Sequence, residues 1–324
     1  RSTRPPPRVR PVPRFRYVVV DVFTDTPLHG NQLAVYTDAR EIPEEMLQPL
    51  AREMNFSETT FVYPPGWPHP TTQQRSQGET ASQVPTGDYN VSETTFVYPP
   101  AAGGHVRMRI FTPGDEVPFA GHPTLGTAFV LAAPLQLGEI RIETGRGIVP
   151  VRLEREGARI VFGRMEQPLP TVEPFSRAAE LQAALGVESE LPVELYDNGI
   201  RHVYVALAST AAVTVLRPDQ RLADLDGVCV NCFAGEGSRW KTRMFAPGLG
   251  VVEDPATGSA AGPLALHLAR HGRISFGEEI EISQGAEIGR PSTLYARVDG
   301  TRDAIERVEV GGSAVVVARG EFQL

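Results

Sequence analysis

Glu58, in the segment NFSETTF at 55–61, has the residue type and the position best suited to acid–base chemistry. Glu58 lies between an amphipathic stretch and an apolar one, so we expect its carboxyl group where a helix ends and a strand begins. Next to Phe56 and Phe61, this carboxyl group can be shielded from solvent. Desolvation raises its pKa toward the range in which a group takes up and returns a proton. An ordinary solvated glutamate is equally compatible with the local sequence.

The segment that contains Glu58 occurs twice. Residues 57–65 (SETTFVYPP) recur unchanged at 92–100, 35 positions later (92 − 57), so Glu93 is an alternative to Glu58. The polar spacer 66–91 is predicted to be a flexible insertion. Glu58 is favoured because a predicted helix precedes it, whereas Glu93 follows a loop. The shorter connection to the next strand is an argument for Glu93. A local duplication or an artefact of the sequence record is expected, since one strand position holds only one copy.

Two turns place small and polar residues at the predicted starts of helices: GHPT at 121–124 and DPATGS at 254–259. Free backbone N–H groups at a helix N-terminus, together with the helix dipole, bind a carboxylate without a cationic side chain. Each turn alone is also compatible with a plain helix cap made by Thr124 or Asp254. Two such turns together favour a shared site for a small anion.

The same two turns follow similar segments. RIFTPG at 109–114 is repeated as RMFAPG at 243–248, 134 positions later (243 − 109), and each copy continues to a turn and a helix of small apolar residues. This internal similarity predicts two halves related by pseudo-symmetry, with a site where the two turns face each other.

Hydrophobic periodicity and turn residues predict the surrounding elements. Helices are predicted at 43–54, 123–133, 177–185 and 259–270. Strands are predicted at 17–23, 33–37, 56–63, 105–112, 150–162, 202–207, 212–216, 280–283 and 294–298.

The chain contains several residues that metal or redox sites use, but their patterns are incomplete. Cys229 and Cys232 are spaced as in redox pairs and zinc sites, yet their apolar flanks (VCVNCF) favour buried thiols on a strand. His267 and His271 are four apart on a predicted helix, but no HExxH pattern is present, and Gly272 favours a helix-end role for His271. The chain also lacks a P-loop, a dinucleotide fingerprint and a GxSxG elbow. We therefore expect no metal and no cofactor.

Composition restricts the possible partners. The 324 residues suffice for one large or two mid-sized domains. Residues 1–16 contain six arginines and no acidic residue, so the formal charge of −8 leaves about −14 on the remainder (−8 − 6). Such an acidic body disfavours nucleic-acid binding. The tail 1–16 is expected to be disordered, or translated upstream sequence, and the chain to be cytoplasmic, because no apolar run resembles a signal peptide or a membrane span.

The chain resembles the PhzF family over about residues 16–324. The resemblance rests on the motifs HGNQLAVY, AREMNFSETTFV, RIFTPGDEVPFAGHPTLGTA, DNGIRHVYV, VNCFAGEGSRWKTRMFAPGLGVVEDPATGSAAGPLALHLARHG and GAEIGRPS. It implies an α+β fold like that of diaminopimelate epimerase, in which two pseudo-symmetric halves each curl a sheet around a central helix and the site lies between them. The N-terminal half is expected to comprise 17–140 and 311–324, and the C-terminal half 141–310.

The resemblance, strongest to the family's phenazine-pathway members, implies a cofactor-independent isomerase of phenazine biosynthesis. Glu58, or Glu93, would move a proton from C3 to C1 of trans-2,3-dihydro-3-hydroxyanthranilate and so form an aminoketone. His122 and Asp254 would hold the substrate's amino and carboxylate groups and tune the glutamate. Residues expected to bind the substrate are Ser57, Gly121, Gly258 and Ser259. A homodimer and closure of the cleft on binding are also implied.

Two other functions are compatible with the sequence. Related epimerases use one cysteine from each half as acid and base, but here the matching turns contain His122 and Asp254, and the two thiols lie elsewhere in the sequence. A two-thiol racemase is therefore disfavoured. An isomerase or epimerase of the same fold that acts on another small amino or hydroxy acid is one alternative. A non-catalytic binder of small acids is the other, if the insertion displaces the working glutamate.

Overall fold

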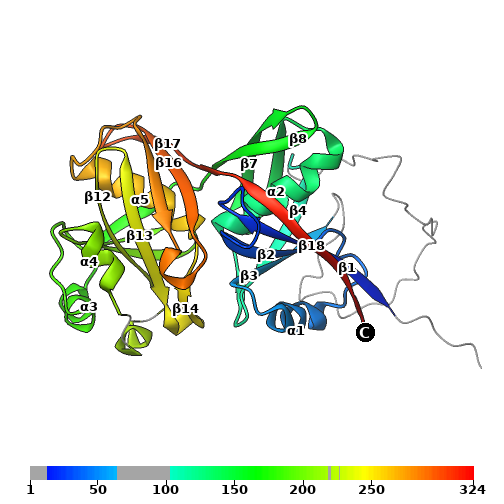
Figure 1. Cartoon of the computed structure of the whole chain (residues 1–324), viewed down its shortest axis with the longest axis horizontal. Coiled ribbons are helices and arrows are strands. Elements are labelled where there is room, and N and C mark those ends of the chain that lie inside the picture. The colour runs from blue at the N-terminus through cyan, green and yellow to red at the C-terminus, as the bar shows by residue number, and fades with distance from the viewer. Residues whose placement is uncertain (1–12, 64–102, 218–219, 226) are drawn as a thin grey trace, which may run out of the picture.

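The computed structural model describes residues 13–63, 103–217, 220–225 and 227–324. The chain forms two lobes that lie side by side, with helix α2 inside one and helix α5 inside the other (Figure 1). Each central helix is surrounded by the strands of its own lobe. The predicted flexible insertion at 66–91 and the alternative glutamate Glu93 lie outside the described residues.

The N-terminal lobe contains the first eight strands and two helices. They are β1 (Arg14–Val22), β2 (Asn31–Tyr36), α1 (Glu44–Met54), β3 (Glu58–Tyr63), β4 (Val106–Phe111), β5 (Glu116–Val117), α2 (Gly121–Leu135), β6 (Glu139–Thr144), β7 (Gly147–Glu156) and β8 (Arg159–Glu166).

The C-terminal lobe contains nine strands, three α-helices and three short 3₁₀ turns among the described residues, and the last strand of the chain returns to the N-terminal lobe. The elements are β9 (Thr171–Pro174), α3 (Ala178–Leu185), β10 (Glu194–Asp197), β11 (Arg201–Ala206), α4 (Thr210–Val215), η1 (Gln220–Asp224), β12 (Cys229–Glu236), β13 (Arg239–Ala246), η2 (Pro247–Leu249), β14 (Val251–Asp254), α5 (Gly258–Arg270), β15 (Glu279–Gln284), η3 (Ala286–Ile288), β16 (Ser292–Gly300), β17 (Ile305–Gly312) and β18 (Ala314–Gln323).

The two lobes repeat one pattern of strand pairing. In the first, β2 and β3 are parallel, β3 and β4 antiparallel, and β4 and β6 parallel. In the second, β11 and β12, β12 and β13, and β13 and β15 repeat these directions in the same order. Arg109 on β4 and Arg243 on β13 occupy equivalent positions, opposite Phe61 and Cys232. The predicted pseudo-symmetry is confirmed.

Strand pairing places the boundary between the lobes later in the chain than expected. β6 pairs with β4, β7 with β6 and β8 with β7, so the N-terminal lobe continues to Glu166. The expected boundary at 140 is therefore wrong, because a sheet assigns strands by hydrogen bonding rather than by position after the helix. β9 then pairs with β10, and β18 pairs with β1. The C-terminal strand β18 thus lies beside β1 of the first lobe.

The basic tail is shorter than expected. β1 begins at Arg14, and its residues Arg14 to Arg16 pair with Gln323 to Glu321 of β18. The prediction of disorder up to residue 16 is wrong for these residues, because the last strand supplies backbone partners that local composition cannot reveal. Residues 1–12 lie outside the described residues.

The two central helices are buried on nearly all sides, as helices that are apolar all round must be. In α5 all residues from Gly258 to Ala269 are buried, and in α2 most residues of the first three turns are. One hydrophobic cluster includes side chains of both helices. The structure confirms the helices predicted near 43–54, 123–133, 177–185 and 259–270.

Two strand predictions need correction. Residues 212–216 fall mainly in α4, because the side chain of Ser209 accepts a hydrogen bond from the Ala212 N–H and caps a helix that the apolar residues alone do not predict. The segment 150–162 is two strands, β7 and β8. They are separated by a turn in which Gly157 has φ of +61°, a conformation that favours glycine.

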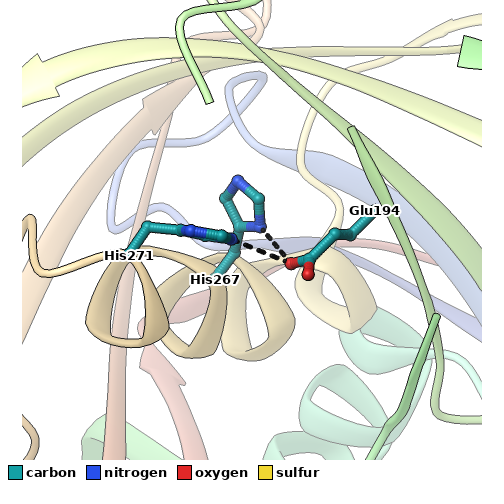
Figure 2. Close-up of side chains that lie close together, drawn as sticks. All are labelled: Glu194, His267 and His271. Carbon is teal, nitrogen blue, oxygen red and sulfur yellow. Dashed lines mark hydrogen bonds and ion pairs between the residues drawn. The ribbon is translucent and has the colours of Figure 1, made fainter. Parts of the chain in front are cut away.

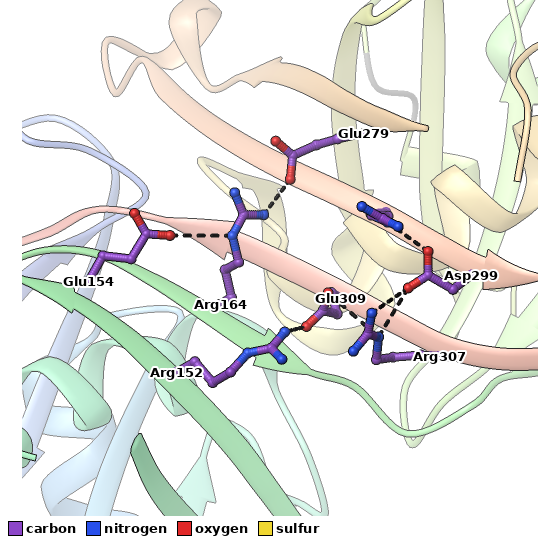
Figure 3. Close-up of polar contacts among 8 residues, drawn as sticks. Arg152, Glu154, Arg164, Glu279, Asp299, Arg307 and Glu309 are labelled. Carbon is purple, nitrogen blue, oxygen red and sulfur yellow. Dashed lines mark hydrogen bonds and ion pairs between the residues drawn. The ribbon is translucent and has the colours of Figure 1, made fainter. Parts of the chain in front are cut away.

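A network of charges joins the lobes where β8 pairs with β17 (Figure 3). Arg152 and Arg164 of the N-terminal lobe form ion pairs with Glu309 and Glu279 of the C-terminal lobe. The other members, which extend the network within each lobe, are Glu154, Arg297, Asp299 and Arg307.

None of the helices in the described part of the chain has the length and hydropathy that crossing a membrane requires.

Candidate active site

A single cavity between the two lobes is lined by every predicted site residue that the structure describes. These residues are Ser57, Glu58, Gly121, His122, Asp254, Gly258 and Ser259. They come from the start of β3, the starts of α2 and α5, and the end of β14. The fold therefore brings together the Glu58 segment and the two turns, which are far apart in the sequence.

The two central helices begin in direct contact at this cavity. A Cβ atom on Gly121 would lie 2.4 Å from the carbonyl carbon of Gly258, so only glycine permits this approach. Neither helix has a side-chain N-cap hydrogen bond. The uncapped N–H groups and the positive ends of both helix dipoles therefore favour an anion at this point.

Glu58 is the carboxyl group of the cavity that is best suited to act as an acid and a base. Its side chain is 14% exposed, and its Oε2 atom is buried with no hydrogen-bond partner among the described residues. Burial, and next the nearby charge of Asp254, raise the pKa of Glu58 to about 8, while the neighbouring Ser57 hydroxyl group acts in the opposite direction. A carboxyl group with this pKa can accept and return a proton near neutral pH.

His122 faces Glu58 across the cavity. Its Nε2 lies 3.5 Å from Glu58 Oε2 and has no hydrogen-bond partner among the described residues. Burial lowers the pKa of His122 to about 3, so the imidazole is neutral. Two polar atoms that face each other without partners are suited to hydrogen bonds with a bound molecule.

Asn31, at the start of β2, connects the predicted residues and was missed in the sequence. Its Oδ1 accepts from Ser57 Oγ at 2.9 Å, and its Nδ2 donates to Asp254 Oδ1 at 2.9 Å. The same Nδ2 lies 3.1 Å from His122 Nδ1. The two N–H groups of Asn31 Nδ2 have acceptors at 2.9 Å in Asp254 Oδ1 and the carbonyl oxygen of Ala256. The sequence feature that could have indicated Asn31 is a polar residue directly before the apolar strand in HGNQLAVY.

Asp254 is fixed at the second turn. Thr257 Oγ1 donates to its Oδ2 at 2.7 Å, and Asn31 donates to its Oδ1. Burial raises the pKa of Asp254, although hydrogen bonds from Thr257 and Asn31 and the nearby Ser57 hydroxyl group oppose the shift. Two buried carboxyl groups in one cavity resist simultaneous ionisation. The pair Glu58 and Asp254 therefore favours one negative charge over two.

His202 is a second lining residue that the sequence did not indicate. It pairs with Cys229 in the parallel ladder of β11 and β12, and its Nε2 lies 3.1 Å from Ser259 Oγ. Asn231 Nδ2 lies 3.4 Å from the other ring nitrogen. Burial lowers the pKa of His202 to about 3, so the ring is neutral, and its hydrogen bond with the Ser259 hydroxyl group orients that group.

The two cysteines are free and buried, as predicted, but Cys229 also lines the cavity. Cys229 is the first residue of β12, as Glu58 is the first residue of β3. Cys229 lies three residues before Cys232, which pairs with Arg243. Glu58 likewise lies three residues before Phe61, which pairs with Arg109. The two helix-entry turns hold His122 and Asp254 rather than thiols, but the fold places Cys229 in the same cavity as Glu58, at the equivalent position of the second lobe. Burial, Asp254 and Glu58 raise the pKa of this thiol, so it is not a base.

Comparison with known proteins identifies the relatives of this chain. The family model PhzC-PhzF, described as phenazine biosynthesis-like protein, matches residues 20–77 and 79–320. The chain belongs to this family. A relative from Pseudomonas aeruginosa is named trans-2,3-dihydro-3-hydroxyanthranilate isomerase; it is 48% identical over 311 residues, which cover 95% of this chain and 99% of the relative.

Solved structures agree with the family assignment. The phenazine biosynthesis protein of the PhzF family from Bacillus anthracis has a TM-score of 0.74 at 23% identity, covering 96% of this chain and 100% of that one. A hydroxyproline epimerase from Agrobacterium vitis has a TM-score of 0.55 at 11% identity, covering 96% and 93%. The expected epimerase-like α+β fold is confirmed.

Proposed function

We propose that this PhzF-family chain is an isomerase of phenazine biosynthesis that acts on trans-2,3-dihydro-3-hydroxyanthranilate. The relative at 48% identity is named for this activity and matches the chain along nearly its whole length. The observation that supports the chemistry best is the Glu58 carboxyl group, which is buried beside His122 and has its pKa raised to about 8.

Glu58 is the proposed acid and base. As a carboxylate, it takes the proton from C3 of the substrate, and as a carboxylic acid it returns that proton to C1 on the same face. The double bonds shift between these carbons, no group is oxidised or reduced overall, and the resulting enol tautomerises to the aminoketone. A single carboxyl group suffices for a shift on one face, and the thiol opposite Glu58 is held in its neutral form.

The other residues of the cavity bind and polarise the substrate in this proposal. The starts of α2 and α5, at Gly121 and Gly258, offer N–H groups to the substrate carboxylate. Asp254 accepts from the amino group, and His122 stabilises the charge that develops next to Glu58. Ser57 and Ser259 complete the polar contacts.

The decisive test is the substitution Glu58→Gln, with Glu53→Gln as the matched control. Glu53 lies on the exposed surface of α1, five residues earlier. We expect Glu58→Gln to lower kcat at least ~100-fold and to abolish exchange of solvent deuterium into C1, whereas Glu53→Gln keeps full rate. Loss of substrate absorbance measures the first effect, and NMR of the product in D₂O measures the second.

Full activity of Glu58→Gln would overturn the role of Glu58, and loss of activity in Glu93→Gln would then assign it to the second copy. If the wild-type chain leaves the phenazine precursor unchanged at high concentration, the proposed substrate is wrong. A deuterium-exchange screen of amino and hydroxy acids then tests the alternative isomerase or epimerase, and stabilisation by an acid without exchange indicates a binder. The homodimer and the cytoplasmic location stay predictions, and light scattering of the purified protein tests the first.

A further inference from the structure

A second cluster of reactive side chains lies at the other end of α5. Figure 2 shows Glu194, the first residue of β10, facing His267 and His271, which are one helical turn apart. His267 is nine residues from Gly258 (267 − 258), or about 13 Å along the helix axis. The sequence supplied only the histidine pair, and the fold adds the carboxylate.

The three donor atoms are spaced like the ligands of one metal ion. Glu194 Oε2 lies 3.0 Å from His271 Nε2 and 3.3 Å from His267 Nδ1, and all three donor atoms lie within 4.8 Å of one another. Tetrahedral zinc has bonds of about 2.0–2.1 Å to nitrogen and oxygen, so its ligand atoms are roughly 3.3 Å apart. Two of the three separations already match this geometry.

Glu194 and His267 already share hydrogen bonds with Tyr196. The Tyr196 hydroxyl group donates to Glu194 Oε2 at 2.8 Å and lies 3.1 Å from His267 Nδ1. A metal ion requires an ionised carboxylate and imidazole nitrogens without a proton, so its binding would displace the protons of these hydrogen bonds.

The surrounding side chains hold the ligands in place. The His267 ring is fully buried, stacks on Tyr204 with centroids 5.6 Å apart, and meets the edge of Phe233 at 5.7 Å. The side chain of His271 is 15% exposed and that of Glu194 13%, so an ion can enter. Ligands whose orientations are fixed before binding lose little conformational entropy when the ion binds.

One neighbouring charge opposes a cation. Arg270 Nη2 lies 3.6 Å from Glu194 Oε1. This oxygen is not the one that faces the histidines, so the guanidinium and an ion would occupy different oxygens of the carboxylate. Two imidazoles and one carboxylate form a ligand set that zinc accepts, with a fourth position left for water.

We propose that Glu194, His267 and His271 bind a divalent transition-metal ion, with Zn²⁺ as the best fit. The ion would link β10 to the C-terminal end of α5, whose first residues line the cavity. Its role is therefore structural, and it supplies no step of the proposed isomerase reaction.

The test uses the untagged full-length chain after treatment with a chelator. Calorimetry with Zn²⁺ is expected to give one ion per chain, and Co²⁺ is expected to give the visible absorption of a tetrahedral site. Zn²⁺ is also expected to raise Tm. His271→Gln and Glu194→Gln should each weaken Zn²⁺ binding at least tenfold, because each removes one ligand. His29→Gln, at a partly buried histidine of the other lobe, should leave binding unchanged.

His271 caps the end of a helix and is partly exposed, so its substitution should leave the fold intact, which circular dichroism checks. Absence of Zn²⁺ binding and of a Tm shift in the wild-type chain would overturn the proposal. Binding that survives in both folded variants would do the same, because the ion would then lie elsewhere. None of these measurements depends on isomerase activity.

Discussion

At the scale of single residues, burial decides how protons are distributed in the cavity. Glu58 and Asp254 are carboxyl groups that burial pushes toward the neutral form, and His122 is an imidazole that burial also keeps neutral. Asp254 has hydrogen-bond donors from Thr257 and Asn31, whereas Glu58 Oε2 has none among the described residues. The negative charge of the pair is therefore better stabilised on Asp254, which agrees with the proposed role of Glu58 as the group that exchanges a proton with the substrate.

The raised pKa of Glu58 predicts that it destabilises the folded chain as pH rises. In the unfolded chain this carboxyl group ionises near pH 4.5, and in the folded chain near pH 8. Between these values the folded state binds the extra proton, so the contribution of Glu58 to the free energy of unfolding falls by at most about 1.4 kcal/mol per pH unit. We expect Glu58→Gln to gain stability relative to wild type from pH 5 to pH 8, as measured by urea unfolding. A constant difference across this range would contradict the pKa.

The same pKa predicts the pH dependence of the proposed reaction. The base form of Glu58 is required in the free enzyme, so kcat/KM should rise with pH and level off above about pH 8. Steady-state rates from pH 6 to pH 9 measure this profile. A rate that is already constant below pH 7 would show that Glu58 ionises in its ordinary range.

His202 is expected to act through Ser259. We predict that His202→Phe raises KM about tenfold, which corresponds to one lost hydrogen bond, and changes kcat little. His202→Gln keeps a donor toward Ser259 Oγ and should recover part of the loss. Steady-state kinetics of both variants check the split between KM and kcat. Equal losses in both variants would indicate damage to the fold rather than a positioning role.

At the scale of secondary-structure elements, the site depends on the contact between the first turns of α2 and α5. Their N-termini meet at Gly121 and Gly258, so the spacing of two helices sets the width of the anion site. The curled sheets fix these helices, because most residues of both are buried against strands.

Gly121→Ala should force the two helices apart. The added methyl group would lie 2.4 Å from Gly258 and Ser259 backbone atoms, which cannot move as a flexible side chain can. We expect a loss of ~1–3 kcal/mol in the free energy of unfolding, as for other overpacked sites, and weaker substrate binding. Gly138→Ala is the control, because its methyl group would meet no atom within 4 Å. Urea unfolding of both variants measures the difference; equal stabilities would refute the close contact.

At the scale of the whole molecule, the lobes are joined by strand pairing and by charges. β18 leaves the C-terminal lobe and pairs with β1 of the N-terminal lobe, and β8 pairs directly with β17. The charge network of Figure 3 lies at this junction. We therefore expect the two lobes to unfold together rather than one after the other.

Glu309→Gln should weaken the junction. Glu309 is 6% exposed and pairs with Arg152 and Arg307, whose guanidinium groups are partly in solvent. We expect a loss of about 1 kcal/mol that shrinks as salt is added. Glu321→Gln, which removes an exposed pair with Arg14, should change the stability much less. Thermal unfolding at low and high salt compares the two; equal effects would exclude a special role for the junction.

Much of the local structure could be predicted from the sequence. The helices and most strands follow from periodicity and from turn residues, because their core faces are apolar at regular spacing. Residues 212–216 were predicted wrongly, since one hydrogen bond from Ser209 favours a helix there. The lobe boundary at 140 was also wrong, because β6 to β8 pair with strands earlier in the chain.

The two helix-entry turns, their repetition in two halves and the candidate glutamate could be predicted from the residues alone, because they are local patterns of residue type and spacing. The burial of Glu58 beside His122, the contacts of Asn31 and His202 with the polar groups of the cavity, and the place of Cys229 in the cavity follow from the folded chain. A pKa and a hydrogen bond depend on the atoms around a group, and here those atoms come from strands and helices of both lobes.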